Sequence, residues 1–321
     1  MIPALEVTGV SKSFAGKELP AVHGANLTLD KGKVLGLLGE SGCGKTTLLR
    51  IIAGFEVPEK GEVRVDGTTV VSEEVMVPPG DRNIGMIFQD FALFPHLTVM
   101  DNILFGVREK DKTRRREIAR QMISLTNLEG LESRKPGALS GGQQQRLALA
   151  RCMAISPRLL LLDEPFSNLD VTLRSQLRQQ VHDLLRTTRT AAVLVTHDIQ
   201  DAVALCDELA VMKDGQILQK APFETIYNEP VNEYVAKLTG PVVELGSTVA
   251  GKKIMIRPEK LSVRGSESKM RARVLDRRFE GNSYAYLLKS GNFEFIFREQ
   301  EVLQPGSEVN LFYDDKHLLR F

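Results

Sequence analysis

The amino-acid sequence predicts an α/β domain built on a parallel sheet, followed by a small all-β domain. Two short apolar runs, residues 159–162 (LLLL) and 191–196 (AAVLVT), are typical of parallel strands buried on both faces. The stretch between them, 173–189, has helical spacing, and alternation of strand, helix and strand indicates a parallel sheet. Beyond about residue 237, short strand-like segments separated by Gly and Ser indicate a barrel or sandwich.

The remaining elements follow in chain order. Residues 1–89 have the pattern of short strands and Gly-rich turns, and residues 98–155 are mainly helical. Gly240 and Pro241 form a candidate linker. We therefore expect an α/β domain over 1–238, with a helical subdomain at about 90–155, and an all-β domain over 239–321. Strands in the second domain are expected at 253–257, 270–279, 284–288, 293–297 and 309–312.

Composition excludes several classes of protein. The 42 basic and 41 acidic residues give a formal charge of +1, which argues against a nucleic-acid binder and against an acidic tail protein. The longest stretch without Asp, Glu, Lys or Arg is eleven residues, 19–29, whereas a membrane helix needs about 20 apolar residues. We therefore expect a cytoplasmic protein, one that could still dock onto a membrane protein. The three cysteines match no CxxC metal site and are expected to be reduced.

Residues 39–46 (GESGCGKT) fit the P-loop pattern, because they follow an apolar strand and open a helix. The glycines allow backbone N–H groups to approach phosphates, and the helix N-terminus adds positive potential. Lys45 would contact the β- and γ-phosphates, and the Thr46 hydroxyl could bind Mg²⁺. Cys43 lies among backbone N–H donors near the helix N-terminus, which predicts a stabilised thiolate.

Asp163 and Glu164 end the run of leucines. A carboxylate at the end of a buried strand beside a P-loop can hold Mg²⁺, and the next carboxylate can polarise an attacking water. By itself, such a pair is also common in ordinary turns.

Another predicted helix begins with Ser140, Gly141, Gly142 and Gln143. This sequence predicts a second helix N-terminus that binds an anion. Taken alone, they would be read as a simple N-cap.

Together these motifs resemble those of ATP-binding cassette (ABC) ATPases. The GESGCGKT loop, Gln89, LSGGQ at 139–143, LLLLDEP at 159–165, SNLD at 167–170 and His197 occur in that family's order, and the likeness covers about residues 4–238. The C-terminal part, with IRPE at 256–259, is similar to the oligonucleotide-binding-like domain of importer ATPases.

The resemblance implies ATP and Mg²⁺ as cofactors. It assigns nucleotide contacts to Phe14, Gly39, Ser41, Gly42, Cys43, Gly44, Lys45, Thr46, Thr47, Ser140, Gly141, Gly142 and Gln143. It assigns metal binding to Thr46, Gln89 and Asp163. It assigns catalysis to Glu164, His197 and Gln89. Phe14 would stack on adenine, although it could also be an ordinary core residue.

The resemblance also implies partners. Ser140 and Gly142 would meet ATP held by a second copy of the chain, with Asp170 at the seam. The segment 90–99, with Phe91, Phe94, Pro95 and Leu97, predicts a docking groove of exposed aromatics, where the family receives a short helix of the membrane subunit. Packing of the helical subdomain on the sheet is the alternative, and both can hold.

The function expected on this basis is the ATPase subunit of an ABC importer. It would sit peripherally on the cytoplasmic face of the membrane with two permease subunits, and an extracytoplasmic solute-binding protein would contribute indirectly. No nucleic-acid partner is expected. The length of segment 68–81 and the stretches around 77–99 and 163–170 favour ferric iron as the solute. Polyamine, sulfate or sugar import, and a soluble ABC ATPase not coupled to transport, are the alternatives.

Overall fold

The computed structural model describes residues 2–16, 18–167, 170–249, 252–265 and 269–321. Contacts between residues divide the chain into two compact units, Met1–Phe223 and Glu224–Phe321. This division falls earlier in the chain than the boundary expected after residue 238. The reason is that helix α8 (Glu233–Thr239) packs through Ala236 against Met255 and Leu319 of the second unit.

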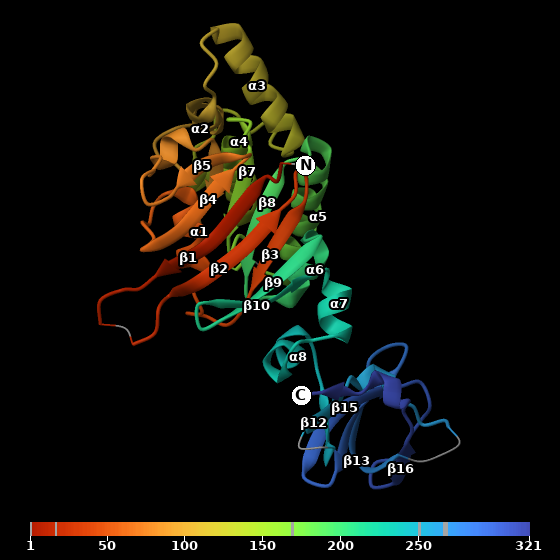
Figure 1. Cartoon of the computed structure of the whole chain (residues 1–321). Coiled ribbons are helices and arrows are strands. Elements are labelled where there is room, and N and C mark those ends of the chain that lie inside the picture. The colour runs from red at the N-terminus through yellow and green to blue at the C-terminus, as the bar shows by residue number, and fades with distance from the viewer. Residues whose placement is uncertain (1, 17, 168–169, 250–251, 266–268) are drawn as a thin grey trace. The chain divides into compact units, whose positions relative to one another are not determined.

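The first unit contains ten strands and six helices among the described residues (Figure 1). The strands are β1 (Leu5–Lys12), β2 (Val22–Leu29), β3 (Val34–Leu38), β4 (Lys60–Val65), β5 (Thr68–Val71), β6 (Ile84–Ile87), β7 (Leu159–Asp163), β8 (Ala191–Thr196), β9 (Glu208–Lys213) and β10 (Gln216–Ala221). The helices are α1 (Lys45–Ala53), α2 (Val99–Gly106), α3 (Lys112–Leu125), α4 (Gly141–Met153), α5 (Val171–Thr188) and α6 (Ile199–Leu205).

A six-stranded sheet in the order β10-β9-β3-β8-β7-β6 forms the centre of this unit. Strands β9, β3, β8, β7 and β6 are parallel, and β10 pairs antiparallel with β9. Every residue of β3, β7 and β8 is buried, as expected for strands covered on both faces. The parallel arrangement brings the carboxyl ends of β3, β7 and β8 to one edge, where ligands of such sheets bind.

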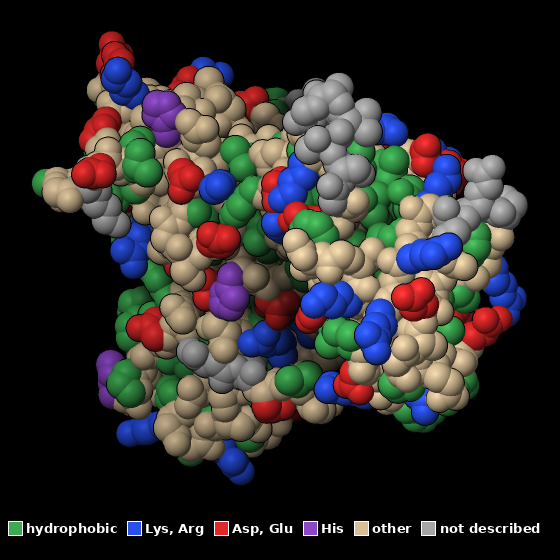
Figure 2. Space-filling model, turned by 90° about the horizontal axis from the view of Figure 1, so that it is seen from below, with side chains coloured by type: hydrophobic (Ala, Val, Ile, Leu, Met, Phe, Trp, Pro, Cys, Tyr) green, Lys and Arg blue, Asp and Glu red, His purple; other side chains and the backbone are tan. Residues whose placement is uncertain are grey.

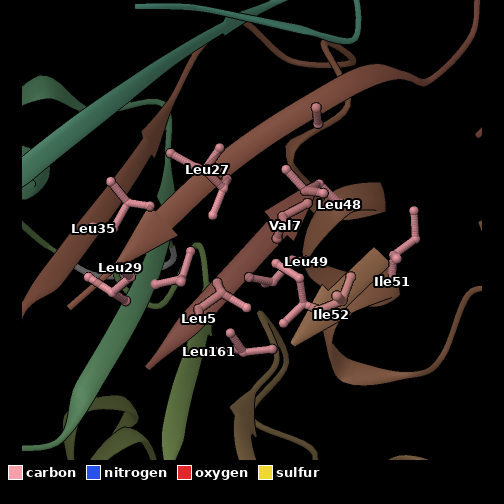
Figure 3. Close-up of a cluster of buried hydrophobic side chains, with 14 of the residues drawn as sticks. Leu5, Val7, Leu27, Leu29, Leu35, Leu48, Leu49, Ile51, Ile52 and Leu161 are labelled. Carbon is pink, nitrogen blue, oxygen red and sulfur yellow. The ribbon is translucent and has the colours of Figure 1, made fainter. Parts of the chain in front are cut away.

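Each face of the central sheet has its own core. On one face, alternate residues of β3, β7 and β8 pack with α1 and with the antiparallel sheet β2-β1-β4-β5. Figure 3 shows Leu49 and Ile52 of α1 on the side of Leu5 of β1 and Leu161 of β7, with Leu48 beside Val7 of β1. On the other face, residues of α4 and α5 cover the sheet. A third cluster joins α2, α3 and α4 into the expected helical subdomain.

The second unit is mainly β-structure. After α7 (Phe223–Asn228) and α8 come β11 (Val243–Val249), β12 (Lys252–Ile256), β13 (Met270–Phe279), β14 (Tyr284–Ser290), β15 (Phe293–Glu299), β16 (Glu308–Leu311) and β17 (Leu319–Arg320). They form two antiparallel sheets, β11-β12-β17 and β15-β14-β13-β16, around one apolar core. Strands β11 and β17 were not predicted from the sequence.

The surface carries both signs of charge close together. Figure 2 shows Lys and Arg side chains interspersed with Asp and Glu over the visible face, in keeping with a formal charge of +1. In the part of the chain that the structure describes, no helix is both long enough and apolar enough to cross a bilayer.

Candidate nucleotide-binding and catalytic site

The P-loop connects the end of β3 to the start of α1, and two of its glycines are required by close backbone approaches. Gly44 has φ of 108°, and a Cβ there would lie 2.0 Å from the carbonyl oxygen of Ala21. A Cβ on Gly39 would lie 2.3 Å from the carbonyl oxygen of Met212. Any larger residue would therefore push the loop away from β9 and from Ala21, the residue before β2. The loop conformation is fixed by packing on both sides.

Lys45 is 4% exposed, although its side chain carries a charge. Its Nζ donates to the carbonyl oxygens of Gly39 at 2.7 Å and Glu40 at 2.8 Å. The ammonium group is thus held inside the curve of the loop by oxygen acceptors. Phosphate oxygens presented to this loop are the same kind of acceptor and carry charge, so they form stronger bonds with it.

Thr46 and Asp163 come together although 117 positions separate them in the sequence. The hydroxyl of Thr46 donates to Oδ1 of Asp163 at 3.1 Å. Burial raises the pKa of the Asp163 carboxyl, and the neighbouring charge of Glu164 adds to this rise. A desolvated carboxylate beside a hydroxyl is the hard oxygen donor set that Mg²⁺ prefers, so these residues fit that ion.

Among the described residues, no group of three or more His, Cys, Asp or Glu could hold a metal on its own. This does not conflict with a magnesium site, because Mg²⁺ in nucleotide sites keeps waters and phosphate oxygens as ligands beside one or two protein groups.

Glu164 has φ of 46°, a left-handed conformation that is uncommon outside glycine. Its backbone N–H donates to the carbonyl of Val195 at 3.0 Å, which ties the residue to the end of β8. One carboxylate oxygen lies 3.2 Å from Nδ1 of His197, the residue that follows β8. The structure thus brings two predicted catalytic residues together at the ends of neighbouring parallel strands.

Gln89 joins this pair through Ser167. Its Nε2 donates to the Ser167 hydroxyl at 3.4 Å, and that hydroxyl donates to the Glu164 carbonyl at 3.0 Å. Gln89 is exposed and follows β6, the edge strand next to β7. The chain of contacts places the ends of β6, β7 and β8 in one polar cluster.

Ser140 caps α4, which is the simpler of the two interpretations of this motif. Its hydroxyl accepts from the Gln143 N–H at 3.4 Å, while the Gln143 side chain accepts from the Ser140 N–H at 2.9 Å. Ser140 is exposed. These bonds lie within the first turn of α4, so they orient the turn without joining it to Lys45 or Thr46.

Phe14 and Asp170 are also accessible. Phe14 is 37% exposed, with Nζ of Lys12 5.2 Å from its ring centre, so an ordinary core role does not fit it. Asp170 caps α5, accepting from the Leu173 N–H at 3.0 Å. Asn168 and Leu169, which precede it in the SNLD motif, lie outside the described residues.

The expected thiolate at Cys43 is wrong. The side chain is 7% exposed, and burial raises the pKa of the Cys43 thiol despite the nearby Lys45. Cys43 packs in the apolar core with α1. The N–H donors of the P-loop therefore do not compensate for the loss of hydration that a thiolate would suffer there.

The expectation of exposed aromatics over 90–99 needs correction too. Phe91 is half-buried and packs against the core under α4 and α5. Phe94 is half-buried, with its ring 4.5 Å from that of Phe105. Phe105 itself, on α2, is 66% exposed. The exposed ring of this region therefore comes from the helix and not from the segment before it.

Sequence reasoning missed Arg174, which connects two parts of the site. Its Nη1 donates to Oδ2 of Asp198 at 2.7 Å, and Asp198 directly follows His197 and caps α6. Its Nη2 lies 3.5 Å from the Ser167 carbonyl. The sequence holds no signal for this role, because the residue is one of several arginines on α5.

Comparison with known proteins gives matches over both units. Residues 22–167 match the model of the ABC transporter family, and residues 254–321 match the model of the TOBE domain. The dimeric, post-hydrolysis structure of the ATP-binding cassette MJ0796 bound to ADP and Pi aligns at a TM-score of 0.58 and 30% identity. That alignment covers 68% of this chain and 98% of that one.

Two curated relatives extend these matches. A spermidine/putrescine import ATP-binding protein, PotA of Oleidesulfovibrio alaskensis, is 43% identical over 252 residues, 77% of this chain and 65% of that protein. The matched part thus spans slightly less than two thirds of it. An Fe(3+) ions import ATP-binding protein, FbpC 2 of Pectobacterium atrosepticum, is 37% identical over 315 residues, 90% of each chain. The chain therefore belongs to the ATP-binding subunits of the ABC transporter family and is an ABC ATPase with a C-terminal TOBE domain.

Proposed function

We propose that this chain hydrolyses ATP at the described site to drive solute import through membrane permease subunits. The observation that carries the proposal is the contact between Glu164 and His197, next to the contact between Thr46 and Asp163. These contacts support roles for Glu164 as general base, for His197 as the group that orients it, and for Thr46 and Asp163 as metal ligands, at one edge of the central sheet beside the P-loop.

The P-loop supports phosphate binding in two ways. Its backbone N–H groups and the start of α1 provide hydrogen-bond donors. Lys45 provides a positive charge, and its ammonium group donates to the carbonyls of Gly39 and Glu40 in this structure. When ATP binds, the β- and γ-phosphate oxygens would replace these carbonyls as the hydrogen-bond acceptors of the Lys45 ammonium group. Phe14, with its exposed ring, would stack on the adenine.

Thr46, Asp163 and Gln89 would hold Mg²⁺, which when bound neutralises charge on the β- and γ-phosphates. Glu164 then remains as the carboxylate that can accept a proton from the attacking water. Its contact with His197 fixes the carboxylate orientation, and the Arg174–Asp198 ion pair holds the turn that carries His197. Positioning of water in line with the γ-phosphoryl is the protein's main contribution to such a reaction.

A second copy of the chain is the proposed partner at the exposed start of α4. Ser140, Gly141, Gly142 and Gln143 lie at the N-terminus of α4, where the positive potential of the helix suits an anion. The aligned MJ0796 structure is described as dimeric, which supports this arrangement. ATP would then lie between the P-loop of one copy and the α4 start of the other.

A hollow between α2 and α3 supports docking of a permease. It has a volume of about 750 Å³ and is lined by Leu97, Leu104 and Phe105 together with Arg115 and Arg116. The full lining has four basic residues against two acidic ones, Asp101 and Glu117, and with the apolar side chains this balance suits an amphipathic helix with acidic residues. Such docking would place the chain peripherally on the cytoplasmic face of the membrane. A solute-binding protein would act on the other face of the permease.

Ferric iron is the proposed solute, and polyamines are the second candidate. The ferric relative matches over 90% of both chains, and this includes the C-terminal unit. The polyamine relative has the higher identity, 43%, but over a shorter stretch of 252 residues.

The test is reconstitution of the full chain with its permease in liposomes that enclose MgATP. We expect ATP-dependent uptake of ferric iron delivered by its binding protein, and no uptake with Lys45→Ala. Uptake of putrescine in place of iron would contradict the solute assignment only. Steady ATP turnover with no association with a permease would favour a soluble ABC ATPase and contradict the import function.

A further inference from the structure

The turn that carries His197 lies between two buried polar residues, Thr196 and Asp201. Thr196 is the last residue of β8 and is 3% exposed, and Asp201 lies on α6 and is 4% exposed. The Thr196 hydroxyl donates to Oδ2 of Asp201 at 3.3 Å. The same oxygen accepts from the backbone N–H of Asp198 at 3.0 Å. One hydroxyl group therefore closes the turn around His197.

The direction of these bonds follows from the chemistry of the groups. A hydroxyl has one proton to donate and two lone pairs that accept. The ionised Asp201 carboxylate can only accept, so it takes the Thr196 proton, and the lone pairs of the hydroxyl remain for the Asp198 N–H. Removal of either side chain would leave a buried polar group without its partner. The bend of the chain at His197 therefore depends on Asp201 as well as on Thr196.

Helix α5 supplies two arginines that hold both ends of this turn. Nη1 of Arg174 donates to the Asp198 carboxylate at 2.7 Å, and Nη1 of Arg178 lies 3.4 Å from Oδ1 of Asp201. The second contact is an ion pair without a hydrogen bond, because Oδ1 of Asp201 has no hydrogen-bond partner among the described residues. Residues four apart lie on the same face of a helix, so both arginines face α6. The turn and the first part of α6 are thus fixed to α5.

Stability alone does not account for the charge at Asp201. Burial raises the pKa of its carboxyl, and the charge of Asp198 adds to this rise, although two arginines are nearby. A raised pKa means that the charged form is less favourable in the folded chain than in the unfolded chain. Ionisable groups with such shifts are concentrated where they place or assist reacting groups.

We propose that Thr196 and Asp201 are positioning residues that place the His197 imidazole against Glu164. Both members of that pair are held at the end of β8, because the Glu164 N–H donates to the Val195 carbonyl and His197 directly follows Thr196. The 3.2 Å between Nδ1 of His197 and the Glu164 carboxylate therefore depends on how the chain turns after β8. This inference rests on the proposed function, which gives His197 and Glu164 their roles in hydrolysis.

The first measurement is the NMR signal of the His197 ring nitrogens in the full chain without nucleotide, at a pH of about 8, where histidine is neutral. The carboxylate of Glu164 should keep the proton on Nδ1, because the partner of a ring nitrogen decides the tautomer. Glu164→Ala should therefore change this signal. We expect the same change in Thr196→Val, whereas Thr196→Ser keeps the hydroxyl and should retain the wild-type signal.

Two substitutions test Asp201. Asp201→Asn keeps an oxygen that can accept from the Thr196 hydroxyl, so the wild-type His197 signal should remain. Asp201→Ala removes that acceptor and should change the signal as Thr196→Val does. Equal changes in Asp201→Asn and Asp201→Ala would overturn the role of the hydrogen bond to Thr196.

Thr190→Val is the matched control. Thr190 is buried just before the other end of β8, and its hydroxyl lies 2.9 Å from that of Thr188. The control removes a hydroxyl from the same strand region, so it should lower Tm about as much as Thr196→Val does. It should leave the His197 signal unchanged.

ATP turnover supplies the second measurement. Thr196→Val should lower kcat about 10- to 100-fold, because a small misplacement of a reacting group is costly. KM should stay within about twofold, because the substitution does not touch the P-loop. Thr190→Val should leave both values near those of the wild-type chain.

The outcomes separate this inference from the proposed function. A wild-type His197 signal in Thr196→Val, together with a changed signal in Glu164→Ala, would overturn the positioning role alone. If Glu164→Ala leaves the signal unchanged, the contact behind the proposed function is contradicted, and this inference falls with it. If Thr196→Val does not fold, the comparison of Asp201→Ala with Asp201→Asn decides in the same way.

Discussion

Replacement of Arg82 by methionine should destabilise the first unit strongly, although Arg82 touches no predicted site residue. The guanidinium is 3% exposed and donates to three backbone carbonyls, those of Ile51, Ile52 and Val77, at 2.7–2.9 Å. Two of these carbonyls belong to the last turn of α1, the helix that begins at the P-loop. Arg82 therefore provides hydrogen bonds to carbonyl groups at the C-terminal end of α1 that have no partner within the helix.

The magnitude follows from the carbonyls that are left behind. The Ile51 carbonyl also accepts from the Gly54 N–H at 3.1 Å, so it keeps a partner. The other two lose the bond from Arg82, at a cost of about 1–3 kcal/mol each. Removal of the desolvated charge, whose pKa is lowered by burial, offsets part of this cost. We expect a net loss of about 3 kcal/mol, or about 6–12 °C in Tm for a unit of this size.

The assay is thermal unfolding of the full chain. It is monitored by the circular dichroism of the helices, most of which belong to the first unit. Arg64→Met is the matched control, because Arg64 is half-exposed and pairs with Glu62 across 2.7 Å at the surface. Surface pairs of this kind contribute little, so the control should shift Tm only slightly. A decrease for Arg82→Met no larger than that of the control would refute the reasoning.

Three further outcomes are expected. Lys45→Ala should abolish ATP turnover, because the phosphate charge then loses its one buried ammonium in the loop; near-normal turnover would contradict the P-loop assignment. Maleimide should label Cys43 slowly, because burial raises the pKa of its thiol, and MgATP should slow labelling further; fast labelling without nucleotide would contradict the buried position. Asp163→Asn should abolish turnover yet raise Tm at neutral pH, because burial raises the pKa of this carboxyl and its charge therefore destabilises the folded state. That gain in Tm should shrink as the pH falls through the raised pKa towards the unfolded value, and a gain that grows towards low pH would contradict it.

The sequence predicted the parallel sheet and the site at its edge because both leave local patterns. Fully apolar runs mark β7 and β8, and the polar residues directly after them, Glu164 and His197, must then meet at the same edge. The Thr46–Asp163 contact follows from the same logic. Such features depend on residue type and order alone.

Contacts to the backbone left no comparable pattern. Arg82 and Arg174 act through carbonyls and caps far away in the sequence, and nothing distinguishes them from the other arginines before the fold is known. The Cys43 prediction failed because it considered the donors around the loop and not the core behind it. Strand β17 has two residues, too few for any periodicity.

The Glu164→Gln variant of the full chain tests the central claim most directly, with ATP binding and ATP turnover measured side by side. Glutamine keeps the shape and can still accept a hydrogen bond, but it cannot take a proton from water. We expect ATP affinity within a few-fold of the wild-type chain and turnover slower by about 10²–10⁴-fold. Because closure depends on ATP and not on its hydrolysis, light scattering should also show a dimer that persists with ATP. Turnover within a few-fold of the wild-type rate would show that Glu164 is not the catalytic base.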